Sequence, residues 1–137
     1  MKVFIDTSAF IALLVEKEQF HEKVAKKYYA YRQERAIFFT SYYILDELLT
    51  RLLYYKESID VKKYIDILKE SINAKELTVL QIDEAVIEKS LEIYVKFSEH
   101  KLSLTDATTY ILYKELKLDE IYTLDSDFRK IGVKTSF

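Results

Sequence analysis

The sequence predicts an α/β fold in which helices cover both faces of a parallel sheet. The clearest indication is Val3–Ile5, three bulky apolar residues typical of a strand that is buried on both faces. This strand ends at Asp6, and residues of helical composition follow it. Further strand-like runs then alternate with helical segments, which are the long crossovers that parallel strands need. With 137 residues, half of them apolar, we expect a single domain over residues 1–137.

The helices are predicted from apolar periodicity and from capping residues. They cover, in order, 8–15, 19–35, 41–56 with Ser41 as the cap, 60–73, 83–97 with Asp83 as the cap, and 103–116. In the third of these, leucine and isoleucine recur every three or four residues and form a broad apolar stripe. In the fifth, we expect six residues to be buried, namely Val86, Ile87, Leu91, Ile93, Tyr94 and Phe97.

Four strands and one short edge strand are predicted between these helices. They cover 3–5, 36–40, 77–82, 120–124 and, after a bend at Gly132, 133–136. Residues 125–127 form a turn. The expected sheet therefore has four to five parallel strands.

Composition excludes several classes of site. There is no cysteine, so disulfides, thiolate metal sites and thiol nucleophiles are absent, and the two histidines are isolated in the sequence. One glycine is too few for a phosphate-binding loop. The 21 basic and 23 acidic residues nearly balance, so RNA binding would need a local patch or a metal. No apolar run could span a membrane, and we expect a cytoplasmic protein without a membrane partner.

Four acidic residues form the candidate site. Asp6 and Asp125 follow strands, Asp106 lies in the first turn of a helix, and Glu47 lies on the helix over 41–56. Carboxylates that converge without a cation repel one another, and a divalent ion with oxygen ligands resolves that repulsion. Phosphodiester cleavage uses such sites with one or two Mg²⁺ or Mn²⁺ ions.

Three of these acids also have ordinary structural interpretations. Asp106 fits the third position of a capping box opened by Ser103. Asp125 is a common turn residue, and so is Asp127. Asp6 could be the N-cap of the helix that follows it, although an acid at the end of a buried strand has a larger desolvation cost than a surface cap.

Glu47 is the weakest candidate by periodicity. It lies off the leucine stripe of its helix, which predicts a solvated side chain, and Asp46 beside it is an equally good candidate. Thr7 and Ser8 lack the sequence context of a nucleophile, so we expect them to orient Asp6 or a bound water.

Four segments resemble a PIN domain of the small VapC-type toxin ribonuclease kind. They are Ile5–Ser8, Leu45–Leu52, Leu104–Ala107 and Tyr122–Phe128, the last followed by Ile131–Val133. The resemblance covers the whole chain in order and spacing. It implies a three-layer α/β/α PIN-like fold, a Mg²⁺- or Mn²⁺-dependent endoribonuclease of a VapBC-type toxin–antitoxin pair, an antitoxin partner and a homodimer.

The resemblance also assigns roles to residues. It places catalytic and metal-binding roles on Asp6, Glu47, Asp106 and Asp125, and so favours Glu47 over Asp46. It implies a supporting hydroxyl from Thr7 or Ser8. Asp127 remains a possible auxiliary acid.

Two other functions stay open at this point. A Mg²⁺-dependent phosphotransfer domain also places an acid after the first strand, although this chain lacks the further acid or lysine that such domains use. A catalytically silent PIN-fold module for RNA binding or assembly is the other alternative, because acidic residues alone do not establish activity.

Basic and aromatic residues give two further expectations. Arg51, Lys56 and Arg129 would help RNA binding if they flank the site. Seven tyrosines have helical spacing, which favours packing in the core or between subunits over base stacking, and we expect a homodimer interface to use them. They are residues 28, 29, 31, 42, 43, 54 and 55.

Overall fold

The computed structural model describes residues 1–137, and its sheet has four parallel strands. The strands are β1 (Lys2–Ile5), β2 (Ile37–Ser41), β3 (Leu77–Leu80) and β4 (Glu120–Tyr122), in the spatial order β3-β2-β1-β4. β1 is central and pairs with β2 on one side and with β4 on the other. The first strand predicted from the sequence is therefore the one on which the sheet is built.

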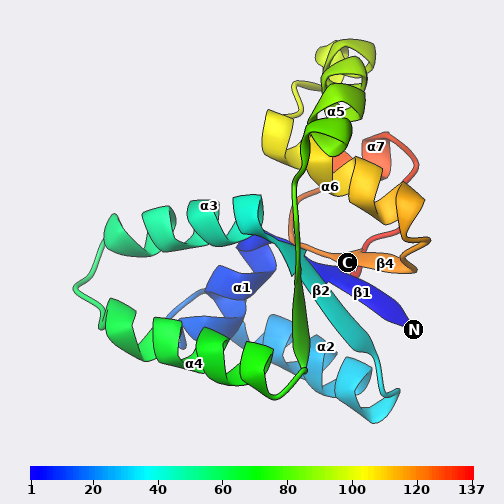
Figure 1. The fold of residues 1–137 in the computed structure, drawn as a ribbon. Helices are drawn as coiled ribbons and strands as arrows, with labels where there is room; N and C mark the ends of the chain where they lie inside the picture. The colour runs from blue at the N-terminus through cyan, green and yellow to red at the C-terminus, as the bar shows by residue number, and fades with distance from the viewer.

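Seven α-helices and one short 3₁₀ helix connect and cover the strands. They are α1 (Thr7–Leu14), α2 (His21–Gln33), α3 (Tyr42–Leu53), α4 (Val61–Asn73), α5 (Glu84–Lys96), the 3₁₀ helix Ser98–His100, α6 (Leu104–Glu115) and α7 (Asp127–Lys130). Figure 1 shows α1 to α4 grouped on one side of the sheet and α5 to α7 on the other. The three-layer α/β/α fold predicted from the sequence is confirmed. No helix has both the length and the apolar character that crossing a bilayer requires.

The core lies around β1 and is closed by aromatic side chains from α2 and β4. Val3 and Phe4 are completely buried. The ring of Tyr31 packs edge-on against Tyr122, with 5.2 Å between ring centroids, and its hydroxyl donates to the buried carboxylate of Glu120 at 2.5 Å. Because this buried carboxylate has a donor, it avoids the cost of an unsatisfied polar group. These contacts hold β4 against α2, while backbone pairing holds β4 beside β1 and so positions the ends of both strands.

The structure differs from the sequence prediction in two short segments. The edge strand expected over 133–136 is reduced to a single bridge between Ile121 and Thr135. The one-turn helix α7, which begins at Asp127 within the predicted turn at 125–127, was not expected from the sequence.

The prediction that Leu91 and Tyr94 are buried on α5 is wrong. Their side chains are 50% and 48% exposed, respectively. α5 lies on the outside of its layer against α6, as Figure 1 shows, and its buried line runs through Val86 and Ser90. The Ser90 hydroxyl donates to the Val86 carbonyl at 2.6 Å, so this polar residue is satisfied within the helix and can be buried.

Candidate active site

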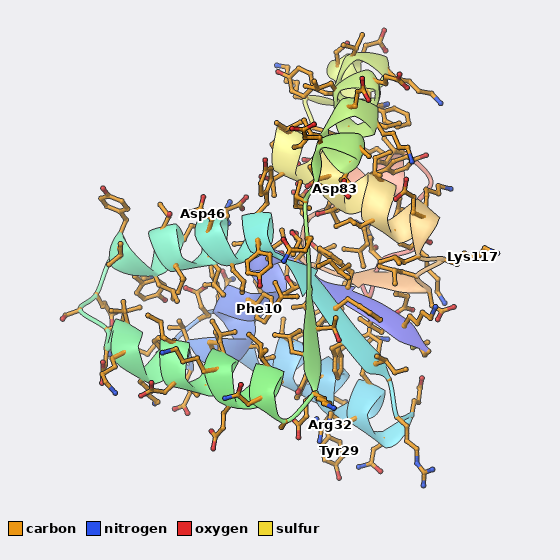
Figure 2. The ribbon with its side chains drawn as sticks, viewed as in Figure 1. Phe10, Tyr29, Arg32, Asp46, Asp83 and Lys117 are labelled. Carbon is orange, nitrogen blue, oxygen red and sulfur yellow. The ribbon has the colours of Figure 1, made fainter.

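A cavity of about 230 Å³ opens at the carboxyl ends of β1 and β4, and only polar residues line it. The lining residues are Asp6, Thr7, Ser8, Glu47, Arg51, Ser103, Asp106 and Asp125. The four acids named from the sequence therefore share one cavity, although they come from four separate segments. Asp127 does not line it, and Asp46 is exposed on the outer side of α3, where Figure 2 labels it.

Asp6 is the buried acid of this cavity. It stands at the N-cap position of α1, but its side chain accepts no capping hydrogen bond. Its carboxylate instead accepts a hydrogen bond from the Thr123 hydroxyl at 2.8 Å. Burial raises the pKa of Asp6 to about 7, the Thr123 bond opposes that rise, and the nearby charges of Asp106 and Glu47 add to it. A nearby cation would therefore stabilise the ionised form of Asp6.

Hydroxyl groups join the end of β1 to the segment after β4. The Thr123 hydroxyl accepts from the backbone N–H of Asp125 at 3.0 Å and lies 3.0 Å from the Ser8 hydroxyl. Ser8 accepts from the backbone N–H of Leu124 at 2.9 Å. This network holds Asp6 and Asp125 in fixed relation. Sequence reasoning missed Thr123, and its only signal was a hydroxyl residue near the end of the strand predicted over 120–124.

Asp106 has both of the roles that the sequence left open. Its carboxylate accepts from the Ser103 N–H at 3.1 Å, while its own N–H donates to the Ser103 hydroxyl at 3.0 Å, which completes the capping box. The same side chain lines the cavity. Burial raises the pKa of Asp106, hydrogen bonds from Ser103 lower it, and the charges of Asp125 and Glu47 raise it.

Glu47 and Asp125 are held by neighbours on their own segments. The Glu47 carboxylate lies 3.1 Å from the Arg51 guanidinium, one helical turn away. The Asp125 carboxylate accepts the backbone N–H of Asp127 at 2.9 Å. Asp127 itself pairs with Lys130 at 2.8 Å, and this bond lowers its pKa. The negative charge of Asp127 is therefore balanced by Lys130, outside the cavity.

The three basic residues named from the sequence lie at different distances from the cavity, and only one of them lines it. Arg51 lines the cavity, whereas the Arg129 guanidinium donates to the backbone oxygen of Phe137 at 2.9 Å. Lys56 lies just beyond the end of α3 and lines a neighbouring groove.

The family model of the PIN domain matches residues 3–134 of this sequence. The chain belongs to the PIN domain family. The PIN fold is also seen in a solved structure of Mycobacterium tuberculosis VapC20, described as a sarcin–ricin loop cleaving toxin, with a TM-score of 0.79 and 20% identity over 96% of this chain and 95% of that one. The Pyrobaculum aerophilum protein PAE2754 is similar with a TM-score of 0.65 and 16% identity, over 98% of this chain and 89% of that one. No curated protein sequence matches this chain.

The donor atoms of this PIN domain's cavity fit a hard divalent cation. Its lining includes four carboxylates and three hydroxyl groups, and oxygen is the ligand atom that Mg²⁺ and Mn²⁺ prefer. The Thr7 hydroxyl is buried beside the cavity without a hydrogen-bond partner. In this conformation no three acidic or histidine side chains are close enough to hold a metal together. Glu47, Asp106 and Asp125 each have a separate hydrogen-bond or ion-pair partner, which engages one carboxylate oxygen and leaves the other without a partner.

Proposed function

We propose that this PIN domain, acting as one domain over residues 1–137, is a divalent-metal-dependent endoribonuclease and the toxin of a VapBC-type pair. The observation that carries the proposal is the cavity in which Asp6, Glu47, Asp106 and Asp125 meet without any apolar lining residue. In this proposal these four acids hold Mg²⁺ or Mn²⁺. The likeness to a toxin that cleaves an RNA loop supports RNA as the substrate and an antitoxin as a partner.

The residues of the cavity have separate tasks in this reaction. Divalent ions lower the pKa of water and stabilise the charge that develops on phosphate oxygens. Asp6, held by Thr123, is the central ligand, because a cation relieves the repulsion that its buried carboxylate experiences. The capping box keeps Asp106 at the start of α6, facing the cavity. No histidine lines the cavity, so a side-chain general base would have to be one of the carboxylates.

Purified protein is expected to cleave single-stranded RNA with Mg²⁺ or Mn²⁺ and to be inactive in excess chelator. Glu47→Gln removes one ligand charge and should reduce the rate by at least about 100-fold. Asp46→Asn on the same helix is the matched control and should keep full activity, because Asp46 is exposed and does not line the cavity. Gel assays of a labelled RNA measure both. Full activity in chelator would contradict the proposal, and RNA binding without cleavage under any metal would favour the catalytically silent alternative.

A homodimer remains part of the proposal. Of the seven helical tyrosines, Tyr31 is buried and only Tyr29, Tyr42 and Tyr54 are largely exposed, so most of the others serve the core. A stronger apolar surface is the face of α5 that exposes Leu91, Tyr94 and Val95, where Leu91 and Tyr94 line a groove beside the segment that leads into α6. Light scattering at micromolar concentration should give twice the mass of one chain. Leu91→Glu should give a monomer, and a monomeric wild type would count against the dimer.

A further inference from the structure

A groove of about 400 Å³ lies beside the acidic cavity and shares Ser8 and Arg51 with it. Its other polar and aromatic lining residues are Glu18, Tyr54, Tyr55 and Lys56. The last three of these follow α3 directly, so the end of this helix forms one wall. The volume lies in the range of small-ligand sites. Because Ser8 and Arg51 line both spaces, a chain-like ligand could run from one into the other.

Tyr54 is the exposed aromatic residue of this groove. Its side chain is 84% exposed, while its backbone N–H still donates to the Thr50 carbonyl at the end of α3. The ring therefore contributes little to the core but stands on a defined backbone. Tyr55 beside it is half-buried and fixed, because its hydroxyl donates to Glu18. That bond, followed by burial, raises the pKa of Tyr55 to about 12, so the ring stays neutral.

Two cations in the groove have capacity for an anion. The Arg51 guanidinium uses one nitrogen for Glu47, and the remaining N–H groups of an arginine can bind a phosphate. Lys56 forms no ion pair in the structure. The carboxylate of Glu18 is already engaged by Tyr55. A ligand with a phosphate and a flat ring matches this pattern.

We propose that this groove holds the nucleotide next to the scissile phosphate of single-stranded RNA. Its base stacks on Tyr54, and its phosphate pairs with Arg51 and Lys56. This inference rests on the proposed ribonuclease function and extends it to a substrate-binding subsite outside the acidic cavity. Stacking is sequence-tolerant because every base presents a flat face, so the subsite would contribute affinity for any base.

The test measures RNA binding without cleavage. Fluorescence anisotropy of a short labelled oligouridine is recorded in chelator, where no metal is bound. Tyr54→Ala should raise Kd by about 5- to 150-fold, the loss of one stacked base, whereas Tyr54→Phe should stay within about twofold of wild type. Tyr29→Ala is the matched control, because Tyr29 is also exposed, at 66%, but lies on the outside of α2 as Figure 2 shows, and it should leave Kd unchanged.

The phosphate contact is tested by salt dependence. Lys56→Gln should reduce the slope of log Kd against log salt concentration by about 0.7, the value for one phosphate contact with a single strand. Lys26→Gln, an exposed lysine of α2, should leave that slope unchanged.

Three outcomes overturn the subsite. The first is an unchanged Kd for Tyr54→Ala, and the second is the absence of measurable binding by wild type. The third is a change of mass for Tyr54→Ala in light scattering, because Tyr54 would then serve a protein contact. A parallel cleavage assay with Mn²⁺ separates this inference from the function. If wild type cleaves RNA while Tyr54→Ala binds normally, only the subsite fails. If binding depends on Tyr54 but wild type never cleaves, only the ribonuclease function fails.

Discussion

Asp6→Asn is expected to stabilise the metal-free protein at neutral and higher pH while abolishing RNA cleavage. The pKa of Asp6 is about 7 in the folded protein and 3.8 for an ordinary aspartate. The folded state therefore binds this proton more tightly than the unfolded state does. Its stabilising effect is complete below about pH 4 and is lost as the pH rises to about 7. The free energy of unfolding should fall by up to roughly 4 kcal/mol over this range.

Urea unfolding in chelator, repeated across this pH range, measures the effect. Asparagine cannot ionise, and its amide oxygen can still accept the Thr123 hydroxyl, so Asp6→Asn should remove most of the decrease seen in wild type. Asp46→Asn changes an exposed acid of α3 and should follow the wild-type curve. If the stability of wild type relative to Asp6→Asn rises from pH 5 to pH 7, the buried, crowded state of Asp6 is contradicted.

The second large effect is expected from the two substitutions of Asp106, because this residue both completes a capping box and lines the cavity. Asp106→Asn removes a charge but keeps an oxygen that can accept the Ser103 N–H. In chelator it should be as stable as wild type or more so. Asp106→Ala loses that hydrogen bond as well and should be about 1 kcal/mol less stable than Asp106→Asn. Neither variant should cleave RNA.

Thermal melts with and without Mn²⁺ separate the two roles of Asp106. Ligand binding stabilises the folded state by mass action, so Mn²⁺ should raise the Tm of wild type and have much less effect on either variant. Asp83→Asn is the matched control, because Asp83 caps α5 by accepting the Val86 N–H at 2.9 Å and lies outside the cavity. It should retain both the Mn²⁺ effect and cleavage. If both Asp106 variants behave like Asp83→Asn, Asp106 is only a cap.

Most of the fold could be predicted because local signals agreed with one another. Ser41, Asp83 and Ser103 were named as caps from sequence, and each accepts a backbone N–H at the start of its helix. The features that the sequence did not predict correctly are either short or depend on tertiary context. α7 has four residues, too few for an apolar period, and the exposure of Leu91 depends on α5 having a neighbour on only one side.

Less of the candidate site could be predicted from the sequence alone. Asp6 and Asp125 could be placed from strand ends, since parallel strands bring their carboxyl ends to one edge. Glu47 could not, because a helical wheel identifies the polar side of α3 but not whether that side faces solvent or a cavity. The wheel therefore left Asp46 and Glu47 equal. The PIN resemblance favoured Glu47, and in the structure Glu47 lines the cavity whereas Asp46 does not. Thr123 was missed because its partner Asp6 is 117 residues away in the sequence.

The sequence distance between Asp6 and Thr123 determines when the site can assemble during synthesis. Ribosomes release the amino terminus first, so β1 can pair with β2 early in synthesis, while its other edge waits for β4. Asp6 lacks its Thr123 partner, and the cavity lacks Asp125, until the chain has been translated through residue 125. A nascent chain shorter than this contains at most three of the four acids and no assembled centre. The proposed nuclease would therefore be inert toward RNA at the ribosome during most of its own synthesis.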